Sequence, residues 1–98
     1  MSNELQFNLA GAIHRGDDKT ALKYAIALRD GGKDDVWQVL LETASAQIDH
    51  KHDVTTPILI KTLHDDAKAY PQSENIFISH AVNALSVARK TVRGGKVA

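Results

Sequence analysis

The chain has 98 residues, enough for one domain with a single core, and its 43% hydrophobic and 24% charged residues are typical of folded globular proteins. It has no cysteine, which excludes disulfide frameworks, thiolate catalysis, iron–sulfur clusters and cysteine-ligated zinc. Twelve Lys and Arg balance twelve Asp and Glu, so no net charge attracts nucleic acid or an anionic membrane. We therefore expect one domain over residues 1–98.

The sequence contains no segment typical of export or membrane insertion. No stretch approaches the roughly 18 apolar residues that span a bilayer, and residues 1–15 lack a basic segment followed by an apolar run. These features predict a cytoplasmic protein without membrane association. The near-zero net charge also favours self-association at neutral pH.

Glycine and aspartate mark the first two expected helices. The first covers about Asn3 to Arg15, carries one apolar stripe, and ends at Gly16, a typical residue after a helix C-terminus. The second begins with Asp17 or Asp18 as its N-cap and ends at Gly31-Gly32. Both helices are therefore amphipathic and have recognisable start or stop signals.

The third expected helix follows Asp34 and Asp35 and has the longest uninterrupted apolar stripe in the chain. The residues of this stripe are Trp37, Leu40, Leu41, Ala44 and Ile48. A stripe of this length predicts a helix at the centre of the fold.

Proline punctuates the last two expected helices. Thr56 before Pro57 predicts an N-cap followed by proline at the first position of the fourth helix. Pro71 ends this helix because the residue before proline disfavours helical geometry. Ser73 is a natural N-cap for the fifth, which we expect to continue to Gly94-Gly95. The fifth helix is apolar around most of its circumference, which predicts a central or interface position.

Short connections between these segments make successive helices antiparallel. The sequence therefore predicts an all-α fold, a single compact domain of about five short antiparallel helices. Both a helical bundle and a set of stacked helical hairpins satisfy the pattern.

Imidazole and carboxylate side chains gather between residues 49 and 80, and these are the groups that bind metals in a protein without thiols. If the fourth and fifth helices pair about Pro71, then His64 and His80 lie at nearly the same height and face each other. Glu42 on the third helix lies at a comparable height. The candidate ligands are His64, His80, Glu42, His50 and His52. The candidate metals are zinc, iron and manganese.

A structural interpretation of the same histidines stays open. The sequence has no HExxH and no Glu-x-x-His motif, and no helix carries two histidines four residues apart. His64 and His80 also fit the edge of an apolar core, and His50 and His52 fit the favourable position of a histidine near a helix C-terminus. The doublets His52-Asp53 and His64-Asp65 are too short to identify a metal-dependent hydrolase.

Other chemistries find little support. No serine lies in a Gly-x-Ser-x-Gly turn, and no glycine-rich loop matches a phosphate-binding motif. Basic residues follow Glu74 near the C-terminus, namely Arg89, Lys90, Arg93 and Lys96. Without interleaved aromatic residues they suit the helix dipole and solubility better than nucleic acid.

Two functional hypotheses follow. The first is a small protein-interaction or assembly module that uses the apolar surface of its C-terminal helix to bind a protein partner or itself, for example as a homodimer. The alternative is a metal-binding helical protein, for example a metal-dependent hydrolase or oxidase. The sequence alone does not decide whether the chain is an enzyme.

Overall fold

The computed structural model describes residues 3–31, 35–88 and 90. Five α-helices form within these residues: α1 (Asn3–His14), α2 (Asp18–Asp30), α3 (Asp35–Gln47), α4 (Thr55–Ala69) and α5 (Glu74–Val87). A 3-10 turn, η1 (Pro71–Ser73), joins α4 to α5. The predicted all-α fold is therefore confirmed.

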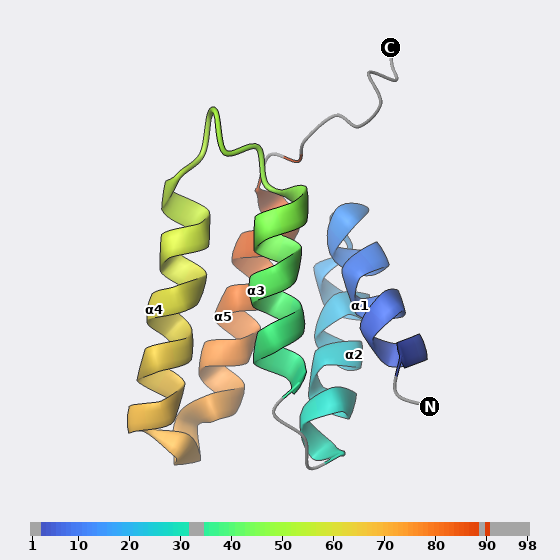
Figure 1. Cartoon of the computed structure of the whole chain (residues 1–98). Helices are drawn as coiled ribbons and strands as arrows, with labels where there is room; N and C mark the ends of the chain where they lie inside the picture. Colours follow the sequence, from blue (N-terminus) through green and yellow to red (C-terminus); the bar gives the residue numbers. More distant parts are fainter. Residues whose placement is uncertain (1–2, 32–34, 89, 91–98) are drawn as a thin grey trace.

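The middle of the molecule is formed by α3 and α5, each of which packs against all four other helices. Figure 1 shows α4 on one side of this pair and the α1–α2 hairpin on the other. The predicted central position of the third helix is confirmed, and α5 takes a central position as well. One hydrophobic cluster joins all five helices, so the short amphipathic helices share a single core.

The core consists of the stripes that the sequence indicated. Its largest fully buried side chains are Leu9, Ile13, Leu40, Ile48, Ile60, Ile78, Leu85, Val36 and Val82. Fully burying a side chain of this size stabilises the folded state by roughly 1.5–3 kcal/mol. Packing rather than helix propensity therefore holds these short helices in place.

The turn between α1 and α2 confirms the predicted stop at Gly16. Gly16 has a positive φ of 76°, its N–H donates to the carbonyl of Ile13, and the N–H of Asp17 donates to the carbonyl of Ala12. This pair of hydrogen bonds is a Schellman motif, which favours glycine at the left-handed position. A side chain at Gly16 would also lie 3.4 Å from the carbonyl oxygen of Ser86.

Aspartate caps two of the helices. Asp17 accepts a hydrogen bond from the N–H of Thr20 at the start of α2, as predicted. At α4 the cap is Asp53 rather than the predicted Thr56, because its carboxylate accepts from both the N–H and the hydroxyl of Thr56. Asp34, after which the sequence predicts the start of the third helix, lies outside the described residues.

These caps make the stability of the fold depend on pH. Hydrogen bonds from Thr20 and Thr56 lower the pKa values of Asp17 and Asp53 below the ordinary 3.8. A carboxyl whose pKa is lower in the folded state stabilises that state fully above its unfolded pKa, and the contribution disappears as the pH falls through the folded pKa. The caps therefore stabilise the fold at neutral pH and are lost in acid.

We expect Asp53→Asn to lower the thermal midpoint at about pH 6 but to have a smaller effect at about pH 2, because the stabilising contribution of the wild-type carboxylate declines as the pH falls toward its lowered pKa. Circular dichroism melts at both pH values measure this difference. Asp65→Asn, at an exposed position on the same helix, is the control. An equal loss at both pH values would show that the charge of Asp53 does not contribute.

The end of α5 differs from the prediction. The sequence predicts a helix that continues to Gly94-Gly95, but α5 ends at Val87, and Ala88 has an extended backbone. Lys90 pairs with Ile48 in an isolated antiparallel bridge, and its ammonium donates to the carbonyls of Ser86 and Ala88. Burial lowers the pKa of Lys90. The helix therefore ends before the residue that pairs with Ile48, and the expected glycine stop lies outside the described residues.

Candidate functional site

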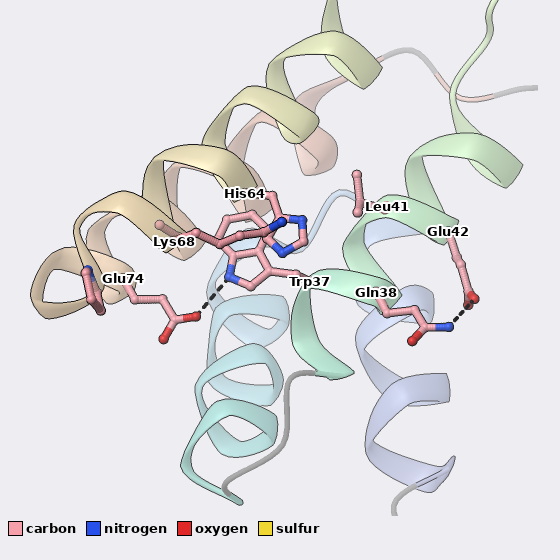
Figure 2. Close-up of a pocket in the computed structure, with 9 residues that line it drawn as sticks. Trp37, Gln38, Leu41, Glu42, His64, Lys68 and Glu74 are labelled. Atoms are coloured by element: carbon pink, nitrogen blue, oxygen red, sulfur yellow. Dashed lines mark hydrogen bonds between the residues drawn. The ribbon is translucent and has the colours of Figure 1, made fainter.

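A groove on the molecular surface runs between α3 and α4 and reaches the first residue of α5 (Figure 2). Its volume is about 650 Å³. We call it the α3–α4 groove, and its lining residues are Trp37, Gln38, Leu41, Glu42, His64, Ala67, Lys68, Pro71 and Glu74. The spacing i, i+4 on α3 and i, i+3, i+4 on α4 brings most of these residues to the facing sides of the two helices.

An aromatic pair forms the floor of the groove. The rings of Trp37 and His64 are stacked, with their centroids 5.2 Å apart and an angle of 14° between their planes. Trp37 is only 3% exposed, whereas His64 is partly exposed. Leu41 lies one turn beyond Trp37 on α3 and is partly exposed as well. The exposed part of the floor is therefore formed by His64 and Leu41, and Trp37 lies beneath them with little surface in contact with solvent.

Glu74 holds this floor at the end of the groove. Its carboxylate accepts a hydrogen bond of 3.0 Å from Nε1 of Trp37 and one of 2.9 Å from Nε of Arg29. The three residues belong to α5, α3 and α2, so the hydrogen bonds join three helices. As the first residue of α5, Glu74 also lies where the helix dipole favours negative charge. The position of Trp37 is thus fixed from two sides, by His64 and by Glu74.

Charged side chains of opposite sign lie on the two walls. Glu42, on α3, accepts a hydrogen bond of 3.1 Å from Gln38 and is exposed. Lys68, on α4, is exposed and makes no ion pair or hydrogen bond within the part of the chain that the structure describes. In Figure 2 the side chain of Lys68 extends across the aromatic pair in this view, and Glu42 lies well apart from it.

Two of the predicted metal ligands line the same groove in the described part of the chain. His64 and Glu42 both line the α3–α4 groove, but His80 lies in a separate depression on the outer side of α5 with Ser79 and Asn83. His80 follows the buried Ile78 by two residues, which is about 200° around the helix. His80 therefore points away from the core, and the expected pairing of His64 with His80 does not form.

The other two histidines lie in the connection between α3 and α4. Nε2 of His50 lies 3.1 Å from the carbonyl of Ser45, and Nδ1 of His52 lies 2.8 Å from the carboxylate of Asp49. The contact of His50 agrees with the interpretation of a histidine at a helix C-terminus. Within residues 3–31, 35–88 and 90, no group of three or more His, Asp or Glu side chains is arranged to hold a metal ion. Binding of zinc, iron or manganese stays a prediction of the sequence.

The sequence did not single out Trp37, Leu41, Lys68 or Glu74 as site residues. Trp37 and Leu41 belong to the apolar stripe that predicted a central helix, so their position beside a groove was not visible. Two features of the sequence could have indicated this site: Trp37, the sole tryptophan of the chain, and His64, which borders the apolar stripe of the next helix. Pairing the two also requires the register of α3 against α4.

No protein-family model matches this sequence, and no curated protein or solved structure matches it either. Among the described helices, none has the length and apolar character needed to cross a membrane. The chemistry of the α3–α4 groove is therefore the basis for inferring a function.

Proposed function

We propose that this chain is a protein-interaction module that holds side chains of a partner protein in the α3–α4 groove. One observation carries the proposal: a concave site of about 650 Å³ with an apolar, aromatic floor and a charged rim. Binding sites in proteins typically have volumes of roughly 300–1,000 Å³ and apolar linings with a few polar groups. Energetically important contacts cluster where a pocket excludes water around aromatic residues.

The floor is also held in shape by the chain itself. Trp37 stacks on His64 and donates to Glu74, which in turn is bonded to Arg29. A surface that is already ordered loses less side-chain entropy when a partner binds. Preorganisation of this kind supports a binding role for the groove.

The apolar surface of α5, which the sequence favoured as the binding surface, supports the proposal less. Its apolar residues are mostly covered by the other helices, and Ile78 and Leu85 are fully buried. Ile76 and Val87 remain exposed, but exposed polar residues, including Ser79, lie between them along the helix. Ile76 and Val87 are therefore separate exposed residues and do not form one apolar surface.

Replacing Leu41 with Arg tests the proposal, because it places a charge at the apolar centre of the groove. The immobilised wild-type chain is exposed to a lysate of its source, and the retained proteins are quantified by mass spectrometry. We expect Leu41→Arg to retain at least one protein about tenfold less than wild type does, which corresponds to a loss of about 1.4 kcal/mol in binding free energy. The retained protein can be a second copy of this chain.

Ser45→Arg is the matched control, since Ser45 is exposed on the same helix and does not line the groove. Melting curves establish that both variants are folded. If wild type, Leu41→Arg and Ser45→Arg retain the same proteins in the same amounts, the groove is not the binding surface and the proposal fails.

A further inference from the structure

We infer that the α3–α4 groove binds a second copy of this chain, with Glu42 of each copy facing Lys68 of the other. The inference rests on the proposed function and names its partner. It depends on the juxtaposition of an acidic wall and a basic wall on either side of one aromatic floor.

The groove is complementary to itself in charge. Glu42 is exposed on α3 and Lys68 is exposed on α4, and neither forms an ion pair within the described residues. In a two-fold symmetric contact the same patch occurs on both sides, so a contact between residues 42 and 68 forms twice. When two copies meet through this surface, Glu42 of each copy can therefore pair with Lys68 of the other, which gives two ion pairs.

The register of the two helices fits a two-fold axis. Trp37 and His64 are stacked, so they mark the same height on the antiparallel helices α3 and α4. Glu42 lies five residues beyond Trp37, about 7.5 Å along α3, and Lys68 lies four residues beyond His64, about 6 Å along α4. Because the helices run in opposite directions, these displacements are opposite and nearly equal, and the aromatic pair lies near the midpoint between Glu42 and Lys68.

Consider a two-fold axis that lies in the plane of contact, passes through the aromatic pair and is perpendicular to the line from Glu42 to Lys68. Rotation about this axis brings Glu42 of each copy opposite Lys68 of the other. This axis also places the openings of the two grooves over each other, so that the second copy covers the partly exposed side chains of Leu41 and His64. The charges mainly select the orientation and the partner.

The charge of the whole chain is compatible with this contact. The 98 residues carry equal numbers of acidic and basic side chains, so two copies approach each other without net repulsion at neutral pH. A different partner would need its own acidic and basic groups at matching heights. A second copy meets that requirement by symmetry.

Charge exchange tests the inference on the purified chain of 98 residues. Sedimentation velocity over a range of concentrations measures the dimer dissociation constant for wild type, Glu42→Lys, Lys68→Glu and the double variant. Each single variant places two pairs of like charges in the contact. We expect each to raise the dissociation constant about tenfold or more, and we expect the double variant to restore dimerisation.

Mixing the two single variants gives the sharpest measurement. In the mixed dimer, residue 42 of the Glu42→Lys copy faces residue 68 of the Lys68→Glu copy. Both residues are substituted, and their charges are again opposite in sign. The second contact keeps the original pair, Glu42 and Lys68. We therefore expect an equimolar mixture of the two variants to form heterodimers at concentrations where each alone is monomeric. An effect on folding alone would not produce this recovery.

Several outcomes would overturn the inference. They are a wild-type chain that stays monomeric at all concentrations, a dimer that neither single variant weakens, and a mixture that shows no heterodimer. A dimer lost in Phe7→Ser, at an exposed position on α1, but unaffected by the charge variants would place the contact elsewhere. If the chain is monomeric yet Leu41→Arg still loses a partner from the lysate, the inference fails while the proposed function stands.

Discussion

Replacing Ile78 with Ala is expected to lower the free energy of unfolding by about 2–5 kcal/mol, the range measured for large-to-small changes in cores. Ile78 is fully buried in α5, one of the two helices that pack against all four others. Truncation removes apolar burial and leaves a cavity among several helices, which cannot all move to fill it. Chemical denaturation followed by circular dichroism measures the loss.

Ile76 provides the matched control for this variant. It lies on the same helix but is 69% exposed, so Ile76→Ala should change the free energy of unfolding by no more than about 0.5 kcal/mol. The two substitutions are chemically identical and differ only in burial. Equal losses from both would contradict the packing described for α5.

The second large effect is expected at Glu74. Glu74→Ala removes the acceptor for Nε1 of Trp37 and for Nε of Arg29. Because the Trp37 side chain is nearly buried, its N–H loses a partner that water replaces poorly, and leaving such a donor unpaired costs about 1–3 kcal/mol. Glu74→Gln keeps one acceptor oxygen, so we expect a smaller loss from it. Thermal and chemical denaturation of both variants provide the measurement.

Asp30 is the control for the charge of Arg29. It pairs with the same guanidinium at 3.4 Å but is 64% exposed, and solvent-exposed ion pairs contribute little. Asp30→Ala should therefore leave stability nearly unchanged. If Asp30→Ala were as destabilising as Glu74→Ala, the effect would come from the charge of Arg29 and not from the bond to Trp37.

Most of the fold follows from local signals in the sequence. Gly16 and Pro71 end helices where predicted, since a left-handed residue and a proline act within one or two residues of their position. The predicted end of α5 was wrong: the helix ends at Val87, and just beyond it Lys90 pairs with Ile48, a residue distant in sequence. A tertiary contact of this kind leaves no local signal.

The candidate site was harder to predict for the same reason. α5 has apolar residues around most of its circumference, so no single stripe in the sequence identified Ile78 as inward and His80 as outward. The lateral position of α4 against α3 decides that His64 stacks on Trp37 instead of approaching His80. Helical periodicity determines which residues share a face, but it does not determine which two faces meet.

The stack of Trp37 on His64 has a practical consequence for experiments in solution. Trp37 is the sole tryptophan in the chain, and it lies in the floor of the α3–α4 groove with its indole N–H bonded to a carboxylate. The wavelength and intensity of its fluorescence emission depend on the polarity and hydrogen bonding around one ring. Unlabelled protein thus carries its own optical reporter, and its emission spectrum follows the groove without a dye or an introduced residue.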